Sequence, residues 1–251
     1  MSPTIKSLIL TSALFSVAAI SSAHVPSTPG NEAAASTPIA EIRAQDRMLS
    51  IQTIAENVAL ARSAYADIHP GYTRFIEAGA LEAAWDGILE RSAREKGLSV
   101  GDFYLALSEV LALIRCDHTK AELPVALSEA RNNTPVYLPL RWTMIDGRAV
   151  MLADTPDGAL RAGDEITSID GRSIPELRRA LHRFIPVDGY NDHVRDSGMA
   201  ASLEFMGGAV DHFGALLWDV PPQAVLQVIR SDGERQTVTL DRTDHAALRK
   251  G

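Results

Sequence analysis

The run Ile114-Arg115-Cys116-Asp117-His118-Thr119 combines a thiol, a carboxylate and an imidazole at neighbouring positions. An imidazole titrates near neutral pH, so His118 could accept a proton from a nucleophile and return it to a leaving group. The run lies where a predicted helical region gives way to predicted strands, and catalytic groups are common in such connecting loops. His118 is therefore the candidate catalytic residue.

Other interpretations of this run stay open. On an extended strand Cys116 and His118 would share a face and could form a thiol–imidazole pair. Cys116 is the only cysteine, however, and a lone cysteine near a helix end is typically a small buried hydrophobe. His118 could also be a structural histidine bonded within its loop. The seven histidines lack His-Glu-x-x-His or comparable spacing, so we expect no metal and no cofactor.

The stretch Leu160–Gly171 predicts a strand bounded by tight turns. A turn is expected at Gly163-Asp164, and Asp170-Gly171 is a strong hairpin signal. Ser173 and the glutamate three positions later form a capping box, which starts a helix directly afterwards. The stretch thus predicts a compact unit of strand, turn, strand and helix.

These residues resemble a PDZ domain, whose pattern Leu-x-x-Gly-Asp-x-Ile-x-x-Ile-Asp/Asn-Gly is matched at each fixed position from Leu160 to Gly171. The resemblance implies capture of an extended peptide, because PDZ domains add a peptide as an extra strand at a sheet edge. The residues that it assigns to peptide binding are Leu160, Gly163, Asp164, Ile166 and Ile169. Turn chemistry in an ordinary strand, turn and helix would explain part of the same pattern.

A wider resemblance covers most of the chain. An apolar leader, a helix ending in His-Pro-Gly-Tyr, the His118 run and the PDZ-like stretch follow one another as in tail-specific, or C-terminal-processing, serine peptidases of the tricorn-like branch. In that family the matching histidine is the general base of a serine nucleophile, so the resemblance implies proteolysis and assigns that role to His118. Two positions depart from the family motif Leu-x-Asp-Gly-His-Thr, because Cys116 replaces an aspartate and Asp117 replaces a glycine or serine.

The family carries its nucleophilic serine, oxyanion hole and supporting carboxylate in a third domain after the PDZ-like module. Nothing between Leu240 and Gly251 matches that domain, and no suitable serine follows Gly207-Gly208. We therefore expect a truncated member that is inactive alone, since binding and oxyanion donors by themselves leave little catalysis. The alternative function is a non-catalytic envelope adaptor that binds peptides through its PDZ-like domain.

The order of elements predicts an α+β protein, in which an N-terminal helical domain is followed by a PDZ-like mixed β-sheet domain. A less regular stretch predicts an insertion of short helices and loops within the second domain. The predicted boundaries are a signal peptide at 1–23, a flexible leader at 24–38, the helical domain at 39–123, the PDZ-like domain at 124–240 with its insertion at about 184–222, and a polar tail at 241–251.

The first residues predict export. An apolar run from Leu8 to Ile20 follows Lys6, and Ser21-Ser22-Ala23 supplies the small residues that signal peptidase recognises. We expect cleavage near Ala23, a periplasmic or extracellular location, and no stable membrane span, because spanning needs about 20 apolar residues. The net charge of −8 and the lack of a basic cluster argue against nucleic acid, so the expected partner is a peptide or protein substrate.

Overall fold

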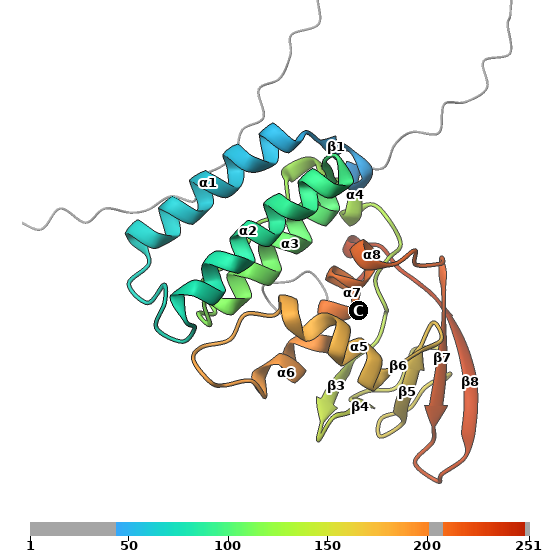
Figure 1. Ribbon diagram of the computed structural model, residues 1–251. Helices are drawn as coiled ribbons and strands as arrows, with labels where there is room; N and C mark the ends of the chain where they lie inside the picture. The colour runs from blue at the N-terminus through green and yellow to red at the C-terminus, as the bar shows by residue number, and fades with distance from the viewer. Residues whose placement is uncertain (1–43, 201–207, 249–251) are drawn as a thin grey trace, which may run out of the picture. The chain divides into compact units, whose positions relative to one another are not determined.

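The computed structural model describes residues 44–200 and 208–248, which belong to a unit spanning residues 42–251 (Figure 1). The expected signal peptide and leader, residues 201–207 of the expected insertion and the last three residues lie outside these ranges. Helices come first along the described chain, and strands with further short helices follow. The α+β class predicted from the sequence is confirmed. Across the described ranges, no helix combines the length and apolar character needed to cross a bilayer.

Three long helices form the first part of the described chain. They are α1 (Ile51–Ile68), α2 (Ala78–Glu95) and α3 (Val100–Leu113). Ser50 and Ser99 begin α1 and α3, because each hydroxyl accepts the backbone N–H three residues later. Helix α2 ends where Lys96 and Gly97 take φ of 59° and 123°, which reverses the chain into the next element.

Shorter elements complete the helical part. They are the 3-10 turn η1 (Ala44–Asp46), the antiparallel pair β1 (Met48–Leu49) and β2 (Leu98–Ser99), and helix α4 (Val125–Asn132). The long helices bury a core around Ile54, Leu81, Trp85 and Ile114. The indole N–H of Trp85 is satisfied inside this core, since it donates to the Tyr72 hydroxyl at 2.7 Å.

The second part is built on a sheet with the order β3-β4-β5-β7-β8, in which β6 also pairs with β5. Its strands are β3 (Trp142–Ile145), β4 (Arg148–Met151), β5 (Glu165–Ile169), β6 (Arg172–Ser173), β7 (Gln223–Ile229) and β8 (Arg235–Asp241). Every pair among these strands is antiparallel, whereas the sequence led us to expect a mixed sheet. The predicted hairpin at Asp170-Gly171 is confirmed, since both positions have positive φ, and Asp146-Gly147 forms a second hairpin turn of the same kind.

Helix α5 (Ile174–Leu181) follows the second hairpin and continues into the 3-10 turn η2 (His182–Phe184). Its predicted capping box is present in full, because the Ser173 hydroxyl accepts the Glu176 N–H and the Glu176 carboxylate accepts the Ser173 N–H. Ile174, Leu177 and Leu181 are the buried positions of this helix. The local sequence therefore accounts for both the start and the buried face of α5.

The stretch expected as an insertion contributes to the core that joins the two parts. It contains α6 (Val194–Ala200), α7 (Ala209–His212) and α8 (Gly214–Leu217), and α9 (His245–Leu248) follows β8. Met199 and Phe213 lie in one buried cluster with Tyr104 and Leu105 of α3 and with Ile166 of β5. The helices and the sheet thus share a core, to which the segment between α5 and β7 contributes.

Candidate functional site

The turn that carries His118 begins directly after α3. Arg115 takes a φ of 58°, which turns the chain away from the helix axis. The N–H of Thr119 then donates to the carbonyl of Cys116 at 3.0 Å, which closes the turn around Asp117 and His118. The run forms a connecting loop as predicted, but the next element is helix α4 and not a strand. Cys116 and His118 lie on a turn of this loop and not on an extended strand.

A second segment, residues 188–192, is fastened to this turn. The backbone N–H of Gly189 donates to the Arg115 carbonyl at 2.9 Å, and Arg115 Nε donates to the Gly189 carbonyl at 2.5 Å. The Asp117 N–H donates to Asp188 Oδ1 at 2.8 Å. Gly189 itself has a φ of 56°, and a Cβ at this position would lie 3.4 Å from the Phe75 ring. The positive φ favours glycine at this position.

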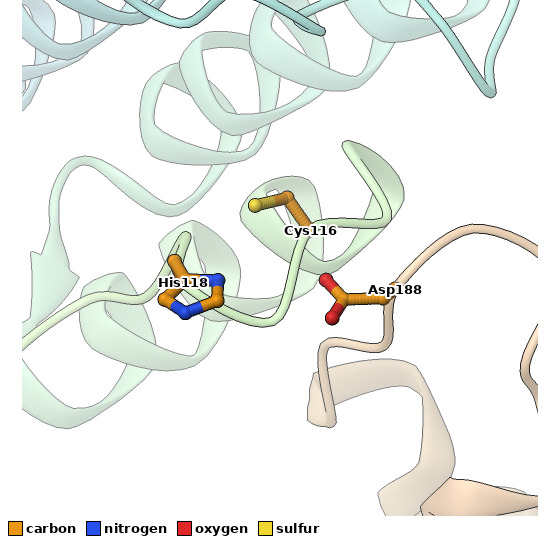
Figure 2. Close-up of side chains that lie close together, drawn as sticks. All are labelled: Cys116, His118 and Asp188. Carbon is orange, nitrogen blue, oxygen red and sulfur yellow. The ribbon is translucent and has the colours of Figure 1, made fainter.

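These contacts bring three side chains together, as Figure 2 shows. A ligand atom from each of Cys116, His118 and Asp188 lies within 4.8 Å of the others. His118 and Asp188 are exposed, whereas Cys116 is half-buried and packs against the core of the helical part. Burial raises the pKa of Tyr65 above its usual value, and the nearby Cys116 thiol raises it further. The arrangement offers sulfur, nitrogen and oxygen donors on an exposed turn.

The sequence pointed to His118 and weighed Cys116 but missed Asp188. The two segments are 71 residues apart at the Asp117–Asp188 hydrogen bond, so no local spacing connects them. The one local signal was Asp188-Gly189, a pair that favours a turn at the start of the irregular stretch. Nothing in that signal indicates which distant loop the aspartate reaches.

The predicted peptide-binding residues lie inside the sheet region. Leu160 and Ile166 have no exposed surface, and Ile169 is 3% exposed. Asp164 is also buried, where it forms an ion pair with Arg230 at 2.5 Å. These four side chains therefore contribute to packing and internal ion pairing.

Gly163 and the strand β5 complete this prediction. Gly163 forms a turn with a φ of 87°, and its N–H donates to the Met151 carbonyl at 2.9 Å. Strand β5 has β4 on one side and β7 on the other, so its backbone is paired within the sheet. Peptide binding through this module stays a prediction, and it would have to use another strand edge.

A second polar cluster is buried between α3, α7 and the strands. Tyr104 and His212 share a hydrogen bond of 2.8 Å between the hydroxyl and Nε2. Asp211 accepts the Leu138 N–H at 3.1 Å through Oδ1. Burial raises the pKa of Asp211 to about 7, against the opposing effects of its hydrogen bond and of nearby arginines. Burial also lowers the pKa of His212 to about 3, and the positive charge of Arg131 lowers it further.

A cavity of about 200 Å³ lies at the N-terminal end of α3. The described residues that line it include Ser99, Asp102 and Trp218, and none of the Cys116, His118 and Asp188 cluster is among them. The cavity and the His118 turn are therefore separate features of the described chain.

Comparison with known proteins finds the same fold among solved structures. No family model and no curated protein matches the sequence. Similar solved structures include CPAF complexed with lactacystin, at 14% identity and a TM-score of 0.50, and a serine-to-alanine mutant of CPAF, at 13% identity and 0.50. Each match covers 76% of this chain and 34% of the CPAF chain. CPAF is a chlamydial serine protease with a tail-specific protease-like fold.

At these identities the likeness shows the fold alone. The described chain therefore has a protease-like fold and spans about a third of the CPAF chains that it matches, at 34%. The sequence-based resemblance and the structural comparison agree on this coarser statement, which is that the fold is of the tail-specific protease kind.

Proposed function

We propose that this chain takes part in proteolysis of peptide or protein substrates, as an exported member of the tail-specific serine peptidase family with His118 as its general base. The observation that carries the proposal is the fold shared with CPAF over 76% of the chain. The exposure of His118 on the turn after α3 supports the assigned role, because a general base must reach its nucleophile.

Alone, this chain is expected to be inactive as a serine peptidase. Within the described ranges, no hydrogen bond joins His118 to a serine hydroxyl. A serine nucleophile must lie within hydrogen-bond reach of its imidazole base. His118 therefore needs a serine from another polypeptide segment, while the sheet region presents the substrate.

The test is hydrolysis of a quenched-fluorescent unfolded protein by two preparations. The first is the purified chain alone, for which we expect no turnover above background. The second adds any polypeptide encoded beyond the codon for Gly251 that carries a serine after a glycine-rich strand. We expect this addition to produce hydrolysis that a fluorophosphonate blocks and that His118→Ala lowers by roughly 10³-fold or more.

His193→Ala is the matched control, because His193 is exposed and lies outside the His118 cluster. It should leave the hydrolysis rate unchanged. Hydrolysis by the chain alone would contradict the proposed inactivity. Hydrolysis that survives His118→Ala would contradict the assigned base.

One observation favours the alternative of a peptide-binding adaptor. Strand β8 pairs with β7 alone among the described strands, so one backbone edge of β8 is available to an added strand. In an antiparallel pair, the backbone N–H groups of alternate residues point toward the partner strand. Arg230 N–H donates to the Glu234 carbonyl and Arg242 N–H donates to the Pro222 carbonyl, so the even-numbered residues of β8 are the ones that bond to β7. By that alternation the backbone N–H of Thr239 points away from β7.

This alternative is tested by fluorescence anisotropy with a library of labelled C-terminal peptides. Binding through the β8 edge should saturate, and Thr239→Pro should abolish it by removing an outward N–H while the β7 ladder is kept. Thr239→Val is the control and should bind normally, because the backbone donor remains. His118→Ala should also bind normally. Saturable binding that Thr239→Pro leaves intact would show that β8 is not the binding edge.

A further inference from the structure

The cluster of Cys116, His118 and Asp188 has a use that is independent of the proposed peptidase role. We propose that these three residues form a binding site for a divalent transition metal of the zinc class. The inference rests on their juxtaposition and donor chemistry, and a His118 imidazole that binds the ion would not act as the general base at the same time.

The donor set suits this class of metal. A thiolate, an imidazole and a carboxylate are the three side-chain types that bind Zn²⁺ in proteins. A soft sulfur donor beside an imidazole excludes Mg²⁺ and Ca²⁺ as the preferred ions, because both favour oxygen ligands. Three protein ligands also leave a fourth tetrahedral position for water, which the exposure of His118 and Asp188 makes accessible.

The distances fit after small side-chain rotations. Metal–ligand bonds of about 2.0–2.3 Å place neighbouring ligand atoms of a tetrahedral site roughly 3.3–3.8 Å apart. In this structure the three ligand atoms lie within 4.8 Å of one another. His118 and Asp188 are exposed and can close the remaining gap by changes in χ angles, which cost little at the surface.

The backbone around the cluster is already held in place. Asp188 receives the Asp117 N–H at 2.8 Å, a bond that orients its carboxylate toward the turn. Hydrogen bonds of this kind commonly orient metal-ligating carboxylates. The bonds between Arg115 and Gly189 add a second link between the two segments. The site therefore needs little reorganisation of the chain to accept an ion.

The cation that precedes Cys116 in the chain is engaged by other groups. Arg115 precedes Cys116 and would repel a divalent ion if its charge faced the cluster. Its Nη2 instead pairs with Asp192 at 2.7 Å, and its Nε is engaged by the Gly189 carbonyl. Asp192 also pairs with Arg195 at 2.9 Å, so its carboxylate is shared between the two arginines.

The test uses Co²⁺ as a spectroscopic substitute for Zn²⁺ on the purified protein. Because Cys116 is the only cysteine, a thiolate-to-cobalt charge-transfer band can come only from this site. We expect that band together with the visible bands of tetrahedral cobalt, in a ratio of one ion per chain. Addition of Zn²⁺ should remove both sets of bands by competition.

Variants separate the site from unspecific binding. Cys116→Ser should abolish the charge-transfer band, and His118→Ala and Asp188→Asn should each weaken cobalt binding at least about tenfold. Asn at position 188 keeps an acceptor for the Asp117 N–H, so this variant removes charge and leaves the hydrogen bond. The matched control is His193→Ala, which should bind within about twofold of the wild type, since His193 is exposed and does not belong to the cluster.

Two results would overturn the inference. The first is cobalt binding without a charge-transfer band, which would place the ion away from Cys116. The second is cobalt binding that shows the band but whose affinity neither His118→Ala nor Asp188→Asn changes. That result would show that Cys116 alone binds the ion. Circular dichroism of each variant checks that the fold is kept, and the surface positions of His118 and Asp188 favour this outcome.

Discussion

Two clusters in this chain each combine a histidine with an aspartate, and they differ in their access to solvent. His118 and Asp188 are exposed, whereas Asp211 and His212 are 4% and 5% exposed. In the buried cluster, protein groups such as the Tyr104 hydroxyl bond the polar atoms. Similar residue types therefore stabilise the fold when they are buried, and they can bind a ligand when they are exposed.

The buried cluster connects segments that the sequence alone separates. Arg131 of α4 donates to the Asp211 carbonyl at 3.0 Å, and Arg242 donates to the Val136 carbonyl at 2.9 Å. Arg242 also pairs with Asp170 at 2.5 Å. The helices, the hairpin at Asp170-Gly171 and the residues after β8 are thus joined by one set of buried polar contacts.

Among substitutions that test the difference between the two clusters, Arg242→Ala should have the largest effect on stability. The Arg242 side chain is 3% exposed, so its loss leaves Asp170 without its cation and the Val136 carbonyl without a donor. We expect a loss of about 3–5 kcal/mol in the free energy of unfolding, as for other broken buried pairs. Urea denaturation followed by circular dichroism measures the loss.

The exposed pair between Arg148 and Glu165 supplies the control. The Arg148 side chain is 59% exposed and its nitrogen lies 3.5 Å from the carboxylate. Arg148→Ala should cost no more than about 1 kcal/mol, because solvent screens such pairs. Equal losses in the two variants would mean that the buried contacts do not hold the parts together.

The pH dependence of stability gives a smaller and more specific effect. The pKa of Asp211 is raised from 3.8 to about 7, so between these values the folded state holds a proton that the unfolded chain releases, and stability falls as pH rises. The pKa of His212 is lowered from 6.5 to about 3, so between these values the unfolded chain holds the extra proton, and stability rises with pH. The two contributions oppose each other between about pH 4 and 6.5.

Asp211→Asn removes the falling contribution. Its free energy of unfolding should therefore rise with pH more steeply than that of the wild type, by roughly 1 kcal/mol per pH unit in this window. His212→Gln removes the rising contribution and should change the slope in the opposite direction. Urea denaturation at several pH values measures both slopes. A change of the same sign in both variants would disprove the opposed protonation of the buried pair.

Much of the local structure was predictable because its causes are close together in the chain. The Ser99 cap, the capping box from Ser173 to Glu176 and the Asp-Gly hairpins depend on residues within a few positions. The candidate site was predictable in part, since the His118 turn follows a helix end that local signals indicate. The strand directions within the sheet were not, because they depend on how distant strands pair.

The α+β class, the N-terminal helical region, the hairpin at Asp170-Gly171 and His118 as a candidate residue all followed from the sequence. Only the tertiary structure decided that Asp188 lies beside Cys116 and His118, that Ile166 and Ile169 face the core, and that Arg242 is buried although it follows the last strand in a polar segment. Caps and turns are set by neighbouring residues through hydrogen bonds and backbone φ. The meeting of distant loops depends on how the whole chain buries its apolar surface, which no single stretch specifies.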